Sequence, residues 1–253
     1  MSLQAPKSPF GEIENHAEGI WYFAYGSNMR SSVMKGRGIM PLKMQAVIVP
    51  DYMLCFDIFG IPYAEPAFAS IAPLLNNEVS GKSPIPPVHG VAYLLTADDY
   101  RRLVVTEGAG VGYDEITVQA RVLDSDEEQA EITARTLKAK YPFRPNRVSS
   151  KRYMGLILDG AEEFHLPQSY RGFLQSLPVY TPASTYRARL GSWTFLAFWQ
   201  RAIRALARLT KVSTNKCGHC PRWLGGVIVA VYRFMWGYHD YVHSKIWSRG
   251  DGC

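Results

Sequence analysis

The chain has 253 residues, of which 47% are hydrophobic and 20% charged, a composition typical of a globular protein with a sizeable core. Residues 1–19 lack the basic start and apolar run of a signal peptide, and no apolar stretch reaches the ~18 residues of a membrane-spanning helix, so we expect a cytoplasmic protein. Residues 1–170 are acidic, whereas residues 171–253 carry 12 Lys and Arg against 2 Asp and Glu, which indicates two parts with different surroundings.

The N-terminal half reads mainly as strands. Residues 21–25 form a strand candidate that runs into Gly26, Ser27 and Asn28, and a short helix ending at glycine is expected over 31–38. Further strands rich in Val, Ile and aromatic residues follow at 44–59, 67–75 and 88–95, the first being one long strand or a hairpin pair, with a turn-rich loop at 76–87.

The next segments mix helices with strands. Residues 96–108 predict a helix capped by Thr96, residues 113–123 and 131–139 predict strands, and residues 148–164 and 167–177 predict helices, the first opened by Ser149 or Ser150 and the second with Pro167 at its first position. Consecutive strands with few helices between them favour an α+β fold with a small mixed, largely antiparallel β-barrel flanked by helices over a doubly wound sheet.

Two glycine patterns do not support a nucleotide cofactor. In SGKS, residues 80–83, Asn76 stands where a phosphate loop needs glycine and Pro84 stops the helix that must follow. Gly108, Gly110 and Gly112 follow a helix and precede a strand, the reverse of the order in a dinucleotide-binding turn. We therefore expect no nicotinamide or flavin cofactor.

Glu107 is the most interesting carboxylate. It follows Leu103, Val104 and Val105, whose apolar side chains would desolvate it, and alternate glycines after it permit close backbone approach. A partly desolvated carboxylate suits proton transfer, so Glu107 is a candidate general base. The alternative is a glutamate at a helix end in water before a glycine cap. The rivals are Asp114 and Glu115, and Glu115 is expected to face solvent.

The turn over Tyr25, Gly26, Ser27 and Asn28 also has two interpretations. It is either a strand-to-helix connection with a capping side chain, or a loop whose N–H groups point at a ligand carboxylate or a developing oxyanion. Ser27 does not fit a hydrolase nucleophile, because no histidine follows in a nucleophile–base arrangement and the sequence is not G-x-S-x-G.

Several of these segments occur together in one known family. FAYGSNM, ASIAP, HGVAYLL, EGAGVGY and the helix SSKRYMGLILDGAEEFHLP resemble, in order and spacing, the γ-glutamylcyclotransferases, over about residues 20–177. The YGSN turn followed some eighty residues later by the Glu-Gly loop is the most specific part. The resemblance implies a small mixed barrel and release of 5-oxoproline from γ-glutamyl compounds, without a metal or another cofactor.

By position, the resemblance makes Glu107 the general acid/base and the backbone of Tyr25, Gly26, Ser27 and Asn28 the cradle for the γ-glutamyl group. Tyr113 would border the site, although the loop before it is one residue shorter than in the family. The WGYHDYVH and SRGDG segments of the tail resemble fungal relatives in epidithiodioxopiperazine (gliotoxin-type) toxin pathways, which implies a glutathione-derived substrate. The rival function is a catalytically silent barrel that serves as a binding or membrane-attached scaffold.

The tail predicts basic amphipathic helices. In residues 192–211 one helical face holds Trp193, Leu196, Trp199, Ile203 and Leu206, with Arg201, Arg204, Arg208 and Lys211 on another, and residues 222–243 predict a second helix. These helices pack on the barrel, form a dimer, or dock on a membrane surface through residues 190–247. Nucleic acid is not an expected partner, because no nucleic-acid fold signature accompanies the charge.

Cys217 and Cys220 with His239 and His243 resemble a zinc ligand set. The 18 residues between the pairs are too long and too helical for a finger, so reduced thiols and helix-end histidines are the preferred interpretation over structural zinc. Taken together, the sequence predicts a flexible segment over 1–19, a catalytic domain over 20–177 and a basic, aromatic helical extension over 178–253.

Overall fold

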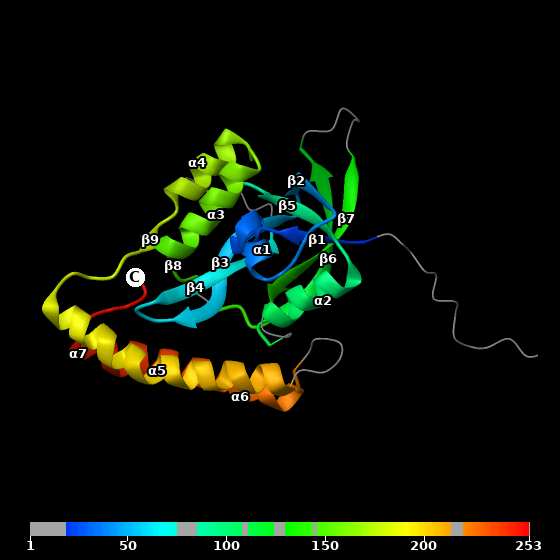
Figure 1. The fold of residues 1–253 in the computed structure, drawn as a ribbon. Coiled ribbons are helices and arrows are strands. Elements are labelled where there is room, and N and C mark those ends of the chain that lie inside the picture. Colours follow the sequence, from blue (N-terminus) through cyan, green and yellow to red (C-terminus); the bar gives the residue numbers. More distant parts are fainter. Residues whose placement is uncertain are drawn as a thin grey trace, which may run out of the picture.

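A closed five-stranded barrel forms the centre of the molecule (Figure 1). Its strands follow the order β1 (Ile20–Ala24), β5 (Val88–Leu95), β2 (Lys43–Val49), β6 (Tyr113–Val122) and β7 (Glu131–Ala139). Neighbouring strands are antiparallel except β1 and β7, whose parallel pairing closes the barrel. The predicted mixed, largely antiparallel barrel is confirmed. The computed structural model describes residues 19–74, 85–107, 111–123, 130–143, 146–213 and 220–252.

A separate hairpin extends from the barrel. It pairs β3 (Tyr52–Ile61) with β4 (Glu65–Pro73), and its register shifts between Cys55 and Ile58. The prediction of a single strand or a hairpin over 44–59 is wrong, because a turn at Pro50 and Asp51 ends β2 in the barrel and sends β3 to a different sheet. The turn-rich loop expected over 76–87 lies mostly outside the described residues.

Helices cover the barrel and begin where the sequence predicts caps. The side chain of Thr96 accepts a hydrogen bond from the Asp99 N–H at the start of α2, and Ser150 caps α3 in the same way through Tyr153. Pro167 is the residue before α4 rather than its first residue. These helices are α1 (Ser31–Gly36), α2 (Ala97–Thr106), α3 (Lys151–Glu163) and α4 (Gln168–Ser176).

The main core fills the barrel and the space under α3 and α4. Phe23, Val91 and Leu103 are fully buried there, as are many side chains around them. Helix α3 approaches the turn after β1 closely at Gly160, where an added Cβ would lie 2.7 Å from the Cβ of Met29. Because glycine removes that clash, α3 rests directly against the turn that contains Ser27.

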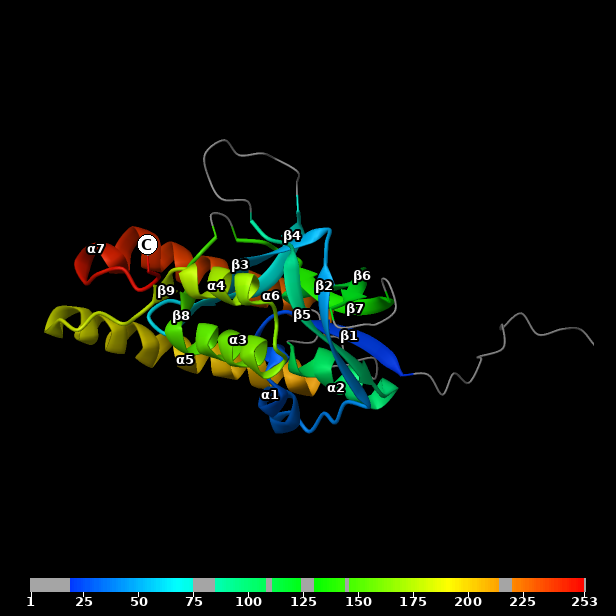
Figure 2. The ribbon, with the colours of Figure 1, turned by 90° about the horizontal axis from the view of Figure 1, so that it is seen from above.

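The C-terminal part is helical and lies along the β3–β4 hairpin (Figures 1 and 2). After a short parallel pair, β8 (Ser149–Ser150) with β9 (Val179–Tyr180), the chain forms α5 (Tyr186–Ser213), α6 (Arg222–Tyr238), a π-helical turn over His239–His243 and α7 (Ser244–Ile246). Within the described residues, no helix combines the length and apolarity that crossing a bilayer requires.

A second core joins this helical part to the hairpin. Tyr63 is buried at the hairpin turn, its ring centroid is 5.2 Å from that of Phe195, and the indole N–H of Trp236 donates to the Gly60 carbonyl at 3.0 Å. Of the apolar face predicted for α5, Trp199 is buried, whereas Trp193 is 67% exposed. The buried face is centred instead on Phe195 and Trp199, because these are the side chains that reach the hairpin and α6.

Candidate active site

Four separate elements meet around Glu107. This residue caps the C-terminus of α2, and it faces the turn between β1 and α1, the beginning of β6 at Tyr113, and α3. The turn contains a single 3-10 helical turn, η1 (Ser27–Met29), which the Met29 N–H closes by donating to the Gly26 carbonyl at 3.0 Å. The long-range barrel pairing therefore joins the two sequence motifs that lie some eighty residues apart.

The Glu107 side chain is held between two donors. Its Oε1 accepts a hydrogen bond from the Asn28 side-chain amide at 2.8 Å and forms an ion pair with Arg37. The side chain is only 18% exposed. The two donors fix the orientation of the carboxylate group.

Asn28 acts through its side chain as well as through the turn backbone. Its amide nitrogen lies 3.1 Å from the Tyr22 hydroxyl and 2.8 Å from Glu107, so it links the first strand to the carboxylate. Its amide oxygen is buried, with no hydrogen-bond partner among the described residues. A buried amide oxygen without a partner is an acceptor available to a donor in the cavity.

Tyr153 of α3 lies against the Gly26 turn. Its hydroxyl accepts a hydrogen bond from the Ala69 N–H at 3.3 Å, and Ser27 hydrogen-bonds the same hydroxyl through its backbone and its side chain. An added Cβ at Gly26 would lie 3.0 Å from this hydroxyl. An alanine side chain would crowd the tyrosine hydroxyl, so the close approach of the tyrosine, rather than an unusual φ angle, favours glycine here.

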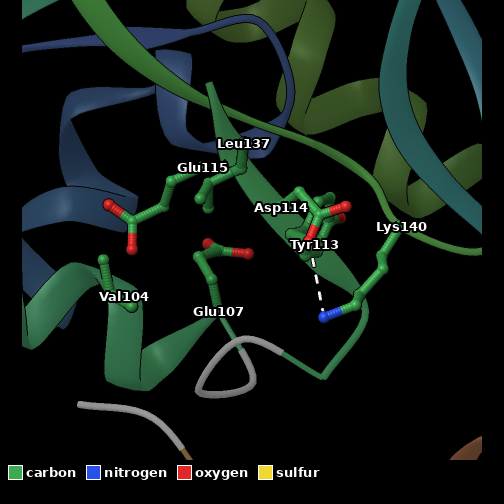
Figure 3. Close-up of a pocket in the computed structure, with 7 residues that line it drawn as sticks. All are labelled: Val104, Glu107, Tyr113, Asp114, Glu115, Leu137 and Lys140. Carbon is green, nitrogen blue, oxygen red and sulfur yellow. Dashed lines mark ion pairs between the residues drawn. The ribbon is translucent and has the colours of Figure 1, made fainter. Parts of the chain in front are cut away.

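Two adjoining cavities open on this arrangement. The inner cavity, of about 20 Å³, is lined by the turn and by Glu107, and its full lining is Tyr22, Tyr25, Gly26, Ser27, Asn28, Ala69, Glu107, Tyr113, Leu137 and Tyr153. The outer cavity, of about 230 Å³, is bordered by Val104, Asp114, Glu115 and Lys140 (Figure 3). Glu107, Tyr113 and Leu137 line both cavities, so the carboxylate stands where the two meet.

The tyrosines around the inner cavity are neutral at physiological pH. Burial raises the pKa of Tyr153 to about 12, while hydrogen bonds from Ala69 and Ser27 act in the opposite direction. Burial, followed by the charge of Glu107, raises the pKa of Tyr22, and burial also raises the pKa of Tyr25 and Tyr113 well above the usual value. These groups therefore line the cavity as uncharged phenols.

The structure brings together the residues named from the sequence. Tyr25, Gly26, Ser27, Asn28, Glu107 and Tyr113 all line the inner cavity. The Tyr25 hydroxyl donates to the Leu137 carbonyl, and that of Tyr113 donates to the Ala69 carbonyl at 3.3 Å.

The two rival carboxylates lie farther out. Asp114 pairs with Lys140 at 3.4 Å, and Glu115 borders the outer cavity and accepts a hydrogen bond from the Tyr100 hydroxyl. Glu115 is exposed, as expected, but the sequence did not indicate its hydrogen bond with Tyr100.

Three contributors were not recognised in the sequence. Tyr22, Arg37 and Tyr153 contact Asn28, Glu107 and the turn, respectively. In the sequence these residues lie within the strand predicted over 21–25 and the helices predicted over 31–38 and 148–164, and no local pattern sets them apart. The one available signal was the position of Tyr153 seven residues before Gly160, which places both on the side of α3 that faces the turn.

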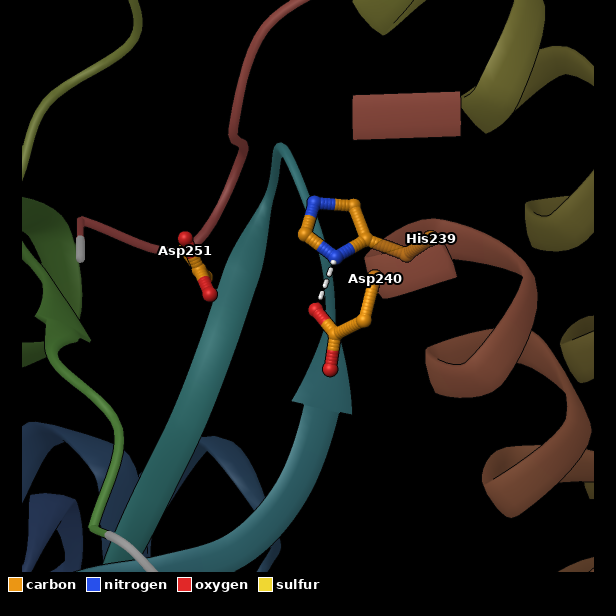
Figure 4. A group of neighbouring side chains, drawn as sticks. All are labelled: His239, Asp240 and Asp251. Atoms are coloured by element: carbon orange, nitrogen blue, oxygen red, sulfur yellow. Dashed lines mark hydrogen bonds and ion pairs between the residues drawn. The ribbon is translucent and has the colours of Figure 1, made fainter. Parts of the chain in front are cut away.

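A group of potential metal ligands lies elsewhere, where α6 ends. His239, Asp240 and Asp251 bring one ligand atom each within 4.8 Å of one another (Figure 4). Arg147 forms ion pairs with Asp240 and Asp251, Arg249 does the same, and His239 Nε2 accepts a hydrogen bond from the Gly250 N–H at 3.1 Å. Two guanidinium groups thus neutralise the carboxylates, so the geometry fits an ion-pair network rather than a cation site.

The zinc set considered from the sequence is not assembled. Cys220 precedes α6, whereas His239 follows it, and a 17-residue helix separates its ends by about 25 Å. His243 Nδ1 lies 3.0 Å from the Tyr63 hydroxyl, so this ring is also engaged in the second core. Cys217 lies outside the described residues.

The chain is similar to curated fungal proteins over most of its length. It is 52% identical over 245 residues to the Gamma-glutamyl cyclotransferase gliK of Aspergillus fumigatus, covering 92% of this chain and 90% of that protein. It is 34% identical to the Gamma-glutamyl cyclotransferase aclK of Aspergillus oryzae, again covering 92% and 90%. Residues 185–246 match the family model described as the AclK C-terminal domain.

Solved structures share the barrel. A structure named "Gamma-glutamyl cyclotransferase" matches with a TM-score of 0.52 and 22% identity, covering 70% of this chain and 99% of that one. A human protein described as "uncharacterized protein loc79017" matches with a TM-score of 0.52 and 24% identity, covering 68% and 96%. At these identities the likeness supports the fold, and the partial coverage is consistent with a tail that those structures lack.

Proposed function

The chain belongs to the γ-glutamyl cyclotransferase family, and from this premise we propose that it releases 5-oxoproline from a γ-glutamyl peptide or a glutathione conjugate. The toxin-type pathway expected from the tail motifs belongs to the same proposal, with a glutathione adduct of a diketopiperazine as the substrate. The observation that carries it is the position of Glu107, whose carboxylate shares one cavity with the Gly26–Ser27 turn.

The reaction is an intramolecular acyl transfer. The substrate's α-amine attacks its own γ-carbonyl carbon, a C–N bond closes the five-membered ring, and the original amide C–N bond breaks to release the rest of the molecule as an amine. One proton leaves the attacking nitrogen and one reaches the leaving nitrogen, so neither water nor a protein nucleophile is consumed. An α-amine has a pKa of about 8 and is largely protonated at neutral pH, so a base is required.

Glu107 is the group proposed to move these protons. It accepts a proton from the attacking amine and returns one to the leaving nitrogen, a form of help worth about 10² to 10⁴ in rate. Asn28 and Arg37 hold its Oε1, which leaves the second carboxylate oxygen for the substrate. Folding the flexible glutamyl chain into an attack geometry contributes as well, by ~7 kcal/mol in favourable intramolecular reactions.

The carbonyl oxygen that becomes negative in the transition state needs donors. The Gly26–Ser27 turn and the Tyr153 hydroxyl lie on the same wall of the inner cavity. The Tyr153 oxygen accepts N–H bonds from Ala69 and Ser27 and, as a phenol, still has its own proton to donate. We assign this wall to the oxyanion. In well-studied hydrolases the loss of one such donor costs about 3 to 4 kcal/mol.

The division of space suggests where each half of the substrate lies. The inner cavity is small and lined by neutral donors, which suits the reacting centre, whereas the outer cavity is larger and lined by Asp114, Glu115 and Lys140, which suits a polar leaving amine. In this proposal residues 20–177 form the catalytic domain and residues 178–253 a separate extension, because the described site residues all belong to the first part.

The test measures 5-oxoproline by mass spectrometry after incubation with glutathione, γ-glutamyl dipeptides, γ-glutamylamines and a glutathione-conjugated diketopiperazine. We expect product from at least one, with the leaving group setting the preference. Glu107→Gln should lower the rate by about 10² to 10⁴ without lowering the melting temperature by more than a few degrees. The matched control is Glu162→Gln, which alters an exposed carboxylate that lines neither cavity and should leave the rate unchanged. An active Glu107→Gln variant would overturn the assignment.

A further inference from the structure

An apolar stripe runs along the solvent face of α6. Trp223, Val227, Phe234 and Tyr238 are 64%, 44%, 69% and 38% exposed. Their spacing of four, seven and four residues places them on one side of the helix. Phe198 of α5, which is 65% exposed, lies beside them across a hollow of about 480 Å³ that Phe234 and Tyr238 also line. A group of large, exposed aromatic side chains on one face of a protein indicates a contact surface.

The charge around this stripe has one sign. Residues 186–213 and 220–246 contain nine Lys and Arg and a single acidic residue, Asp240. Asp240 is already in ion pairs with Arg147 and Arg249 at the far end of α6. The basic side chains are exposed, and several flank the stripe, as Arg233 does beside Phe234 and Arg201 one turn after Phe198. The partner surface must therefore be negative and must also accept aromatic rings.

We propose that the α5–α6 face docks on the surface of an anionic lipid bilayer. The aromatic rings insert at the level of the headgroups, while the arginines at the edge of the stripe pair with lipid phosphates and carboxylates. The helices lie in the plane of the surface and do not span it. A second copy of the chain fits less well, because face-to-face association brings two sets of arginines together without acidic partners.

The test uses the full chain and sedimentation with vesicles of phosphatidylcholine alone or with about 30% phosphatidylserine. We expect at least ten-fold stronger binding to the anionic vesicles and at least a five-fold loss in 0.5 M salt, because surface attraction is screened. Tryptophan fluorescence should be quenched by lipids brominated on the acyl chains near the headgroup. Binding that is absent, or equal for both vesicle types, contradicts the proposal.

Two variants separate the apolar and electrostatic contributions. Trp223→Ser with Phe234→Ser should abolish quenching and lower binding at least ten-fold, and Arg201→Glu with Arg233→Glu should remove the preference for anionic lipid. The matched controls alter the barrel: Met40→Ser with Leu42→Ser, which are 65% and 61% exposed, and Lys43→Glu with Lys151→Glu, which are also exposed. These controls should bind like the unaltered chain.

A dimer would overturn the proposal. In that case light scattering would show a mass that doubles with concentration, Trp223→Ser with Phe234→Ser would return it to the monomer, and vesicles would not compete. Release of 5-oxoproline by every variant is measured in parallel. It should be unchanged, since none of these residues lines the cavities around Glu107, and a chain without cyclotransferase activity that still binds anionic vesicles leaves this proposal standing.

Discussion

Two carboxylates in this molecule have similar surroundings and different uses. Glu107 and Asp251 both pair with arginine. Each site also contains a glycine in close contact with a tyrosine: Gly26 lies against the Tyr153 hydroxyl in the cavity of Glu107, and Gly250, next to Asp251, lies against the Tyr63 ring. Asp251 is completely buried between two arginines, and the Tyr63 hydroxyl donates to the Ser248 carbonyl and lies 3.0 Å from His243 Nδ1. Glu107 has one arginine and borders two cavities.

The difference lies in what each carboxylate reaches: Glu107 lines two cavities, whereas Asp251 is 0% exposed, although its partner Arg249 and Tyr63 line a cavity of about 310 Å³. In the second core, rings fill the volume around Arg147, whose guanidinium lies 4.8 Å from the Phe143 centroid and 4.7 Å from that of Trp236. A carboxylate enclosed in this way can only stabilise the fold. Around Glu107 the same kinds of group leave two cavities, so this carboxylate is placed to contact a ligand, as its proposed role requires.

The largest effect is expected on the unfolding free energy, at the buried carboxylate Asp251. Arg147→Met leaves Asp251 buried with only one of its two arginines, and removal of one partner from a buried ion pair costs about 3 to 5 kcal/mol in unfolding free energy. Urea unfolding measures the loss. The control is Arg121→Met, which removes an ion pair to Glu131 with both side chains 50% exposed and should cost less than about 1 kcal/mol. Equal losses in the two variants would contradict the distinction.

The next effect is expected at the proposed active site, where a substitution would fill the free space beside Glu107. Gly26→Ala places a Cβ 3.0 Å from the Tyr153 hydroxyl and 3.4 Å from the Ala69 Cβ, against an inner cavity of about 20 Å³. We expect kcat/KM for 5-oxoproline release to fall by about 10²-fold, the usual result of displacing a transition-state donor. Gly36→Ala, which meets no atom within 4 Å, should retain full activity. A fully active Gly26→Ala enzyme would show that this wall does not touch the reacting atoms.

The smallest effect is expected in how the stability of the C-terminal helices depends on pH. Burial lowers the pKa of His239 and of His243. For His239, the nearby Asp240 and Asp251 raise the pKa, whereas Arg249 lowers it further. Both rings are therefore buried in their neutral form. Their contribution to folding stability is fully present above the ordinary histidine pKa of about 6.5, and it is lost as the pH falls through the lowered pKa values of the folded state.

Hydrogen exchange near pH 7.5 and pH 5.5 measures this effect segment by segment. Amides of residues 239–250 should lose more protection at the lower pH than amides of the barrel strands, since burial lowers the pKa of only one barrel histidine, His89, among the described residues. His243→Phe should flatten the dependence. Equal loss in barrel and tail would show that the two histidines do not stabilise the docked helices.

Local patterns in the sequence were sufficient for the elements and for part of the site. Runs rich in Val, Ile and aromatic residues, with alternation over 113–123, located the barrel strands. Thr96 marked one helix start, and Ser149 or Ser150 marked another, because strand patterns and caps are local properties. Glu107 was recognised from its apolar neighbours and the following glycines. Its position beside the Gly26 turn was an expectation from family resemblance, and the barrel pairing of β1 with β5 and β7 explains it.

The remainder depends on contacts between distant parts of the chain. Nothing near Arg37 indicates that it pairs with a residue seventy positions later, and the pattern of 44–59 does not reveal that β3 pairs with β4 while β2 joins the barrel. The exposure of Trp193 has the same origin. A helical wheel gives a broad apolar face, and the neighbouring hairpin decides that Phe195 rather than Trp193 is buried.

The position of Tyr63 has a consequence for how the chain is made in the cell. This tyrosine precedes its hydrogen-bond partner Ser248 by 185 residues. Since ribosomes add ~5 to 20 residues per second, the tip of the β3–β4 hairpin emerges roughly 10 to 40 s before the helices that cover it. During translation its aromatic surface is open to chaperones, and slow synthesis of the tail would lengthen the period in which nascent chains can aggregate.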